Sequence, residues 1–150
     1  MYRHREKGDA DDPGDRRKGI GQPGIGSQKT GICSLFRLSV GAALLTADGH
    51  RYLGGNIENA SYGATNCAER TAFFKAVSEG EREFTAIAIA GGISGEAPVE
   101  YAYPCGICRQ VMQEFCRDDF VIYVVNSEQD YQRYTLKELL PFGFGGDAIR

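Results

Sequence analysis

Three cysteines and one glutamate stand where they could hold a metal ion and move protons. Glu69 follows Cys67 by two positions, and two residues separate Cys105 from Cys108. Two cysteines at that spacing at the start of a helix can face one metal ion, and a third thiolate from a second helix completes a set of three protein ligands. Catalytic zinc sites keep such a set and leave the fourth position for water. The pattern therefore predicts one catalytic Zn²⁺ ion per subunit, held by Cys67, Cys105 and Cys108.

The main alternative for these cysteines is a structural zinc site, which would normally have four protein ligands. The chain has five cysteines, so Cys33 and Cys116 are the candidates for a fourth ligand. Cys116 lies more than two helical turns beyond Cys108, which points its thiol away. Glu69 favours the open site, because it lies too close to Cys67 along the chain to be a comfortable ligand and suits the role of proton shuttle. The odd cysteine count also argues against a disulfide framework.

Two arginines near the cysteines are expected to balance the charge of the site. Three thiolates leave a zinc centre net negative, which weakens the pull of the metal on its water. Arg70 stands one helical turn after Cys67, and Arg109 directly follows Cys108, so each can donate hydrogen bonds to sulfur and offset that charge. A surface salt bridge is the alternative role for either arginine.

The elements that must position these residues alternate between strands and helices. Strands are expected at 35–46, around Tyr52 and Leu53 after a turn at Asp48 and Gly49, at 84–90, at 121–125 and at 131–134. Helices are expected at 67–78 with Asn66 as the cap, at about 105–116 and at 136–140. Strands that alternate with helices predict an α/β fold in which part of the sheet is parallel.

Composition excludes several classes of protein. The chain has 150 residues and a net charge of −3, which allows one domain with one moderate core. Residues 40–150 carry nine basic and fifteen acidic side chains, and such an acidic body argues against a nucleic-acid polymer as substrate. No apolar run approaches the length of a membrane span, and the N-terminus lacks a secretory signal. We therefore expect a cytoplasmic protein that uses neither a membrane nor a nucleic acid.

The segments 56–62, 66–70 and 104–110 resemble those of the small homotetrameric cytidine deaminases of the three-cysteine type. The likeness covers about 40–144 and includes the 135–141 ending. It implies a three-layer α/β/α fold with a mixed sheet of about five strands. It also implies zinc-dependent hydrolytic deamination of cytidine and 2′-deoxycytidine to uridine and 2′-deoxyuridine in pyrimidine salvage, by a chemistry known for zinc deaminases as a class.

The resemblance also assigns roles to single residues. It implies that Asn56 and Glu58 hydrogen-bond the ribose 3′-hydroxyl, for which loop capping is the alternative. The Ala68 backbone and the Glu69 side chain are implied to read the edge of the pyrimidine ring. Glu69 would take a proton from the attacking water, protonate ring N3 and later pass a proton to the leaving amine.

Further expectations concern assembly and substrate. The three-cysteine type forms homotetramers, and either Phe142 or Phe144 would reach towards the pocket of a neighbouring subunit. A deaminase of the blasticidin-S type is one alternative function. A zinc-binding homologue that has lost activity through its altered N-terminus is the other.

The resemblance stops at Val40. Relatives have an N-terminal helix and a Pro-Tyr-Ser-x-Phe-x-Val segment whose Phe lines the nucleoside pocket, and residues 33–39 differ from it. These residues can be back-translated so that the frame one base later reads Ala-Pro-Tyr-Ser-Ala-Phe-Pro, which favours a frameshift; a divergent N-terminus is the alternative. We therefore divide the chain into a poorly matching segment at 1–34, for which disorder is one expectation, and a cytidine deaminase domain at 35–150.

Overall fold

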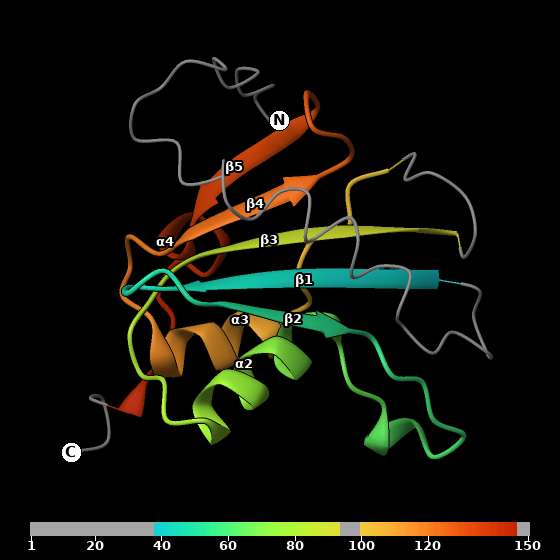
Figure 1. Cartoon of the computed structure of the whole chain (residues 1–150), viewed down its shortest axis with the longest axis horizontal. Coiled ribbons are helices and arrows are strands. Elements are labelled where there is room, and N and C mark those ends of the chain that lie inside the picture. The colour runs from blue at the N-terminus through green and yellow to red at the C-terminus, as the bar shows by residue number, and fades with distance from the viewer. Residues whose placement is uncertain (1–37, 94–99, 147–150) are drawn as a thin grey trace.

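A mixed five-stranded sheet forms the centre of the protein (Figure 1). The computed structural model describes residues 38–93 and 100–146. The strands are β1 (Leu38–Thr46), β2 (Arg51–Gly55), β3 (Phe84–Ile93), β4 (Val121–Val125) and β5 (Tyr131–Thr135). Their order across the sheet is β2-β1-β3-β4-β5, with β3 and β4 parallel and the other neighbours antiparallel. The predicted α/β fold with a mixed sheet of about five strands is confirmed.

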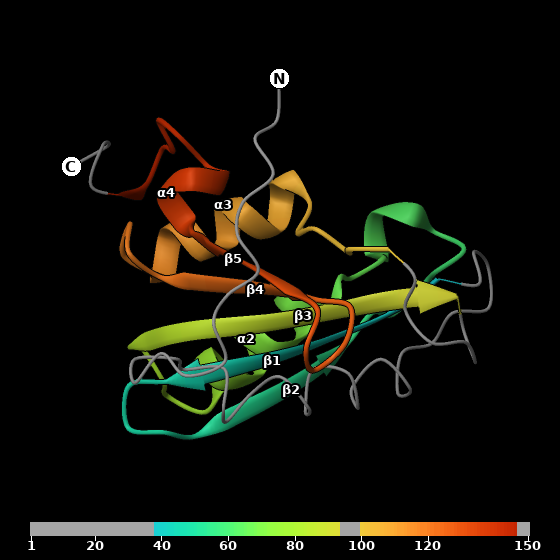
Figure 2. The same cartoon turned by 90° about the horizontal axis from the view of Figure 1, so that it is seen from above.

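The helices of the described residues pack on one face of this sheet (Figure 2). They are α2 (Ala68–Ser78), α3 (Gly106–Phe115) and the short α4 (Leu136–Leu139). A single 3₁₀ turn, η3 (Tyr62–Ala64), buries no residue. Residues of α2, α3 and α4 share one buried cluster with strand residues of that face. The second helical layer that an α/β/α arrangement requires is not formed by residues 38–93 or 100–146. No helix in the same ranges has the length and apolar character needed to cross a membrane.

Successive side chains along each strand point to opposite faces of the sheet. In β1, Ala42 and Leu44 belong to the cluster beneath the helices, whereas Ala43 belongs to the opposite face, as the two-residue period of a strand requires. Phe73 of α2 fills the space between helices and sheet. Its ring lies 5.1 Å from that of Phe84, 6.2 Å from that of Phe115 and 6.1 Å from that of Phe120, measured between centroids. These contacts fix α2 against α3 and therefore fix the relative position of the two helix N-termini.

The start of α2 differs from the prediction that Asn66 caps it. The N-cap is Cys67, which has extended backbone angles, and the helix begins at Ala68. Asn66 instead exchanges two backbone hydrogen bonds with Ile57, at 2.8 and 2.9 Å, and its side chain donates to Thr71 Oγ1 at 3.0 Å. Asn66 therefore ties the loop before α2 to the chain that leaves β2, and Cys67 is left at the helix end.

The structure also differs from the prediction at another strand end. The strand predicted at 84–90 continues to Ile93, because its later residues still pair with the start of β1. The predicted start of the first strand at Leu35 and the predicted domain boundary at 34/35 lie outside the described residues.

Gly54 sets how closely β2 approaches α2. A Cβ atom at this position would lie 2.2 Å from the carbonyl oxygen of Ala68 and 2.6 Å from the backbone nitrogen of Ala72. Both atoms belong to the helix backbone, which cannot move aside as a flexible side chain could. The absence of a side chain at Gly54 therefore lets the first turn of α2 lie directly on the sheet.

We expect Gly54→Ala to lower the free energy of unfolding by about 1–3 kcal/mol or more, because the new methyl group overlaps helix backbone. Gly63→Ala is the matched control, because its Cβ meets nothing within 4 Å, and it should change stability by no more than about 0.5 kcal/mol. Urea unfolding followed by circular dichroism measures both. Equal stability of the two variants would contradict the close approach of α2.

Candidate metal centre

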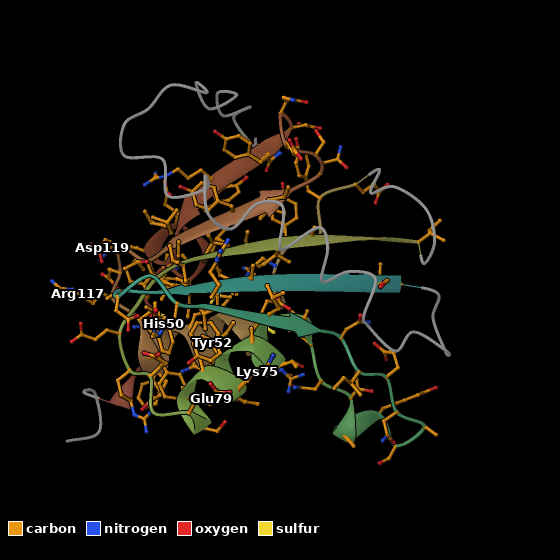
Figure 3. The ribbon with its side chains drawn as sticks, viewed as in Figure 1. His50, Tyr52, Lys75, Glu79, Arg117 and Asp119 are labelled. Carbon is orange, nitrogen blue, oxygen red and sulfur yellow. The ribbon has the colours of Figure 1, made fainter. Side chains whose placement is uncertain are left out.

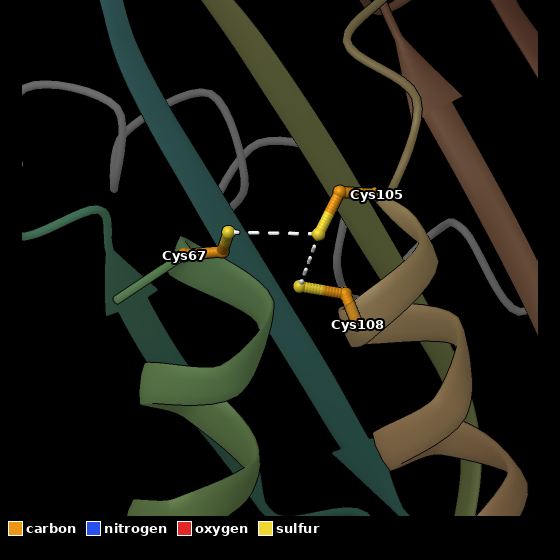
Figure 4. Close-up of side chains that lie close together, drawn as sticks. All are labelled: Cys67, Cys105 and Cys108. Atoms are coloured by element: carbon orange, nitrogen blue, oxygen red, sulfur yellow. Dashed lines mark hydrogen bonds between the residues drawn. The ribbon is translucent and has the colours of Figure 1, made fainter. Parts of the chain in front are cut away.

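The structure brings the three predicted zinc ligands together at the facing ends of α2 and α3 (Figure 4). Cys67 caps α2, Cys105 caps α3, and Cys108 lies in the first turn of α3. The Cys67 and Cys105 sulfurs are 3.8 Å apart, and those of Cys105 and Cys108 are 3.6 Å apart. Two sulfurs that each lie about 2.3 Å from a tetrahedral zinc ion are about 3.8 Å apart. The spacing of the thiols therefore fits zinc.

The group has three members among the described residues, not four. No further Cys, His, Asp or Glu ligand atom of residues 38–93 and 100–146 joins it. Cys116 follows the last residue of α3, at the opposite end of the helix from Cys105. Cys33, the other candidate for a fourth ligand, lies outside the described residues. Within the described part of the chain, the donor set is that of an open centre with a position for water.

The surroundings of Cys67 favour its thiolate form. The Cys108 thiol is hydrogen-bonded to Cys67. The Arg70 guanidinium also donates to the Cys67 sulfur at 3.6 Å. Both contacts lower the pKa of Cys67, which is about 5. The same hydrogen bond, together with burial, raises the pKa of Cys108. The two pKa values therefore shift in opposite directions: the surroundings favour the thiolate of Cys67 and the thiol of Cys108.

Arg70 and Arg109 donate hydrogen bonds to different kinds of acceptor. Arg70 contacts the Cys67 sulfur and also donates to the carbonyl oxygen of Thr65 at 3.2 Å, which agrees with its predicted role beside a ligand. Arg109 was expected to donate to sulfur as well. In the structure its guanidinium donates instead to the carbonyl oxygens of Pro104 at 2.8 Å and Leu139 at 3.0 Å. Arg109 thus joins α3 to the end of α4 and braces the loop that carries Cys105.

A pocket of about 580 Å³ opens beside the cysteines. Glu69 lines it although only 4% of the residue is exposed. Burial raises the pKa of Glu69 to about 7, and the negative charge of Cys67 contributes to the rise. A carboxyl group with a pKa near neutrality can both accept and donate a proton. Ala68 is fully buried in the same wall, and its N–H belongs to the first turn of α2, where N–H groups have no partner within the helix.

Asn56 and Glu58 lie at another wall of this pocket. Asn56 is 5% exposed, and its amide is already engaged by the protein. Its Nδ2 donates to the carbonyl oxygen of Leu38 at 2.9 Å and to Glu58 Oε1 at 3.2 Å, and its Oδ1 accepts from the backbone N–H of Val40 at 2.9 Å. Both amide hydrogens are thus used, whereas the oxygen retains one free lone pair. Asn56 therefore holds the start of β1 in place and orients the Glu58 carboxylate.

Two pocket residues were not foreseen as part of the site. Tyr101 and Tyr103 stand just before Cys105 in the sequence, and their rings line the pocket. The Tyr101 hydroxyl donates to Asp130, and the Tyr103 hydroxyl donates to Gln132. The β4–β5 hairpin therefore holds this wall from outside. The only sequence signal was their position next to the paired cysteines.

Comparisons with known proteins agree with this geometry. The model of the cytidine and deoxycytidylate deaminase zinc-binding region matches residues 28–124. The chain belongs to this family. The match begins upstream of Val40, where the resemblance seen in the sequence stopped, and it includes all three cysteines and Glu69.

Individual family members are similar over most of their length. The chain is 54% identical to a cytidine deaminase of Halalkalibacterium halodurans over 113 residues, which are 75% of this chain and 82% of the relative. A blasticidin-S deaminase of Bacillus cereus is 32% identical over 108 residues, 70% of this chain and 76% of the relative. The crystal structure of a cytidine deaminase from Burkholderia pseudomallei superimposes with a TM-score of 0.74 at 38% identity, covering 82% of this chain and 94% of that one.

We expect Cys67→Ser and Cys108→Ser to lose most bound zinc, because each removes one of the three predicted thiolate ligands. Cys116→Ala is the matched control, since it deletes a cysteine at the far end of α3 and should retain the metal. Zinc is measured by plasma mass spectrometry after desalting. Loss of zinc from the Cys116 variant, with retention in the other two, would contradict the assignment of the centre.

Proposed function

We propose that the chain deaminates cytidine and 2′-deoxycytidine hydrolytically to uridine and 2′-deoxyuridine. One observation carries the proposal: three thiols lie together, and two of them, Cys67 and Cys105, line a pocket whose wall also contains the buried carboxyl group of Glu69. Similarity to proteins named cytidine deaminase supports the same activity. We also propose one zinc ion per subunit, a cytoplasmic location and a role in pyrimidine salvage.

The proposed chemistry divides between the metal and Glu69. Cys67, Cys105 and Cys108 would hold a zinc ion, which when bound makes water a stronger nucleophile at neutral pH. Glu69 takes a proton from the water that adds to C4 of the ring and delivers it to N3. It then helps transfer a proton to the amino group, which leaves as ammonia. Its burial keeps the carboxyl group near the pKa at which both transfers are accessible.

Recognition of the nucleoside follows from the remaining polar groups of the pocket. The N–H of Ala68, in the first turn of α2, suits the ring carbonyl oxygen, which is the acceptor on the pyrimidine edge beside N3. The Glu58 carboxylate accepts from the ribose 3′-hydroxyl. Asn56 orients Glu58 through its Nδ2 and can itself offer only its oxygen to the sugar, because its amide hydrogens are engaged.

Glu69→Gln tests the mechanism. The amide keeps the size of the side chain but cannot shuttle protons, so we expect kcat for cytidine to fall by about 10²–10⁴-fold while bound zinc is retained. The matched control is Glu114→Gln, which makes the same change on the exposed surface of α3 and should leave kcat unchanged. Activity is followed by the ultraviolet change as cytidine becomes uridine. Full activity of the Glu69 variant would exclude the proton shuttle.

A second candidate substrate comes from the similarity to the Bacillus cereus blasticidin-S deaminase. Cytidine, 2′-deoxycytidine and blasticidin S should therefore be compared with one enzyme preparation. We expect the highest kcat/KM with the two nucleosides, since the chain is 54% identical to a cytidine deaminase and 32% identical to the blasticidin-S deaminase. A preference for blasticidin S would reverse the assignment.

The N-terminus decides whether this polypeptide is active as it stands. Residues 33–37 lie outside the described residues, and the frameshift remains a prediction. Leu38 and Val40, which follow them, line the pocket, where relatives are expected to place a phenylalanine. If a folded, zinc-loaded protein shows no turnover, replacing residues 18–39 by the shifted-frame sequence, which restores both the N-terminal helix and the Ala-Pro-Tyr-Ser-Ala-Phe-Pro segment, should restore it. Failure of that exchange would favour a homologue that binds zinc without catalysis.

We propose that the protein is a homotetramer in which Phe142, not Phe144, contacts a neighbouring subunit. Phe142 is 101% exposed, and Phe144 is 58% exposed. Phe142 also has a positive φ of 60°, a conformation that costs about 1–3 kcal/mol in a residue other than glycine. A contact between subunits would offset both costs, because it would bury the ring and stabilise the backbone that presents it.

Phe142→Ala should weaken the tetramer and raise KM for cytidine, whereas Phe144→Ala should have a smaller effect on both. Size-exclusion chromatography with light scattering measures the mass of each variant over a dilution series. If Phe144→Ala dissociates the protein and Phe142→Ala does not, the assignment of the two rings is reversed. A monomeric parent protein would exclude the tetramer.

A further inference from the structure

A second group of metal-ligating side chains lies where the turn between β1 and β2 meets the segment after α2. Asp48 and His50 belong to the turn, and Glu81 follows the end of α2. The ligand atoms of all three lie within 4.8 Å of one another. His50 Nδ1 is 3.2 Å from Asp48 Oδ2 and 3.1 Å from Glu81 Oε1. The eleven residues of α2, about 16 Å of helix, separate this group from Cys67.

Hydroxyl groups hold both carboxylates in position. The buried Thr46 hydroxyl donates to Asp48 Oδ1, which leaves Oδ2 facing the His50 ring. The Tyr52 hydroxyl donates to Glu81 Oε1 at 3.1 Å. The backbone N–H of Glu81 also donates to the carbonyl oxygen of Ala76 at 3.0 Å. Such outer hydrogen bonds orient ligands before a metal binds.

The charges around His50 favour a cation. Among residues 38–93 and 100–146, His50 is the only group that forms an ion pair with Asp48 or Glu81. Two nearby cations are engaged by backbone groups: Lys75 donates to the carbonyl oxygen of Leu53, and Arg82 donates to the carbonyl oxygens of residues 77 and 81.

Figure 3 shows that a further acid lies close by. Glu79, which follows the last residue of α2, lies beside Tyr52, and the Tyr52 hydroxyl donates to Glu81. Glu79 also contributes to raising the pKa of Tyr52, after burial and Glu81. The two carboxylates of Asp48 and Glu81 thus face one exposed imidazole, and Glu79 adds a third acid beside Tyr52.

We propose that Asp48, His50 and Glu81 bind a divalent transition-metal ion, separate from the cysteine centre. One imidazole nitrogen and two carboxylate oxygens suit Zn²⁺, Ni²⁺ and Co²⁺. Donor atoms about 2.1 Å from one ion lie about 3.0 Å apart in octahedral geometry and about 3.4 Å apart in tetrahedral geometry, and the two measured separations of 3.1 and 3.2 Å fall between these values. The His50 side chain is 67% exposed, so water can complete the coordination.

Ni²⁺ added to the zinc-loaded chain, made without a polyhistidine tag, tests the proposal by isothermal titration calorimetry. A dye that reports released Zn²⁺ shows that the cysteine centre stays filled. We expect one Ni²⁺ ion per chain, abolished by His50→Gln and weakened about ten-fold by Tyr52→Phe, which removes only an outer hydrogen bond. Circular dichroism confirms that the variants fold.

Two matched variants give the controls. His4→Gln removes the only other histidine of the chain, and Glu83→Gln removes an exposed acid two positions after Glu81; both should bind Ni²⁺ as the parent does. Absence of Ni²⁺ binding would overturn the proposal. So would binding that survives His50→Gln or disappears with His4→Gln.

Discussion

The packing of α2 against α3 around Phe73 determines where the three sulfurs lie. Cys67 and Cys105 are not on the sheet but at helix ends, so their separation depends on how the two helices pack. The aromatic contacts of Phe73 set the distance between the helices, and Gly54 allows the first turn of α2 to lie directly on β2. A shift of either helix would change the 3.8 Å separation of the Cys67 and Cys105 sulfurs. The apolar core and the metal centre therefore depend on the same contacts.

Positive charge acts on the thiols of the site, whereas burial acts on its carboxyl group. Three sulfurs gather at two helix N-termini, whose positive ends favour thiolates, and Arg70 adds a full charge at the Cys67 sulfur. Glu69 lies in the same wall but is buried, so its carboxyl group retains a proton at a higher pH than usual. Neighbouring groups thus have opposite tendencies: the pKa of Cys67 is lowered, and that of Glu69 is raised. Because the two pKa values shift in opposite directions, one small site can both hold a cation through its thiolates and transfer protons through Glu69.

Much of this arrangement could be predicted from short-range patterns. The spacing of Cys105 and Cys108, and of Cys67 and Glu69, identified the chemistry because each motif lies within one helical turn. The sequence could not show that Arg109 would bind carbonyl groups, since that depends on where α4 ends. Nor could it show the pocket role of Tyr101, which depends on the β4–β5 hairpin. The cluster at His50 was also missed, because Glu81 reaches it only after α2 has packed on the sheet.

The parallel pairing of β3 and β4 has a consequence for how the chain folds. Parallel neighbours need a crossover, and α3, with Cys105 and Cys108, lies on the connection between these two strands. Cys67 and Cys105 are 38 positions apart, so a shared ion would close a long loop and restrict the unfolded chain. Pairing between distant segments is slow to form. A metal bound across α2 and α3 would therefore act as a cross-link that stabilises the non-local half of the sheet, coupling metal supply to the lifetime of the folded protein.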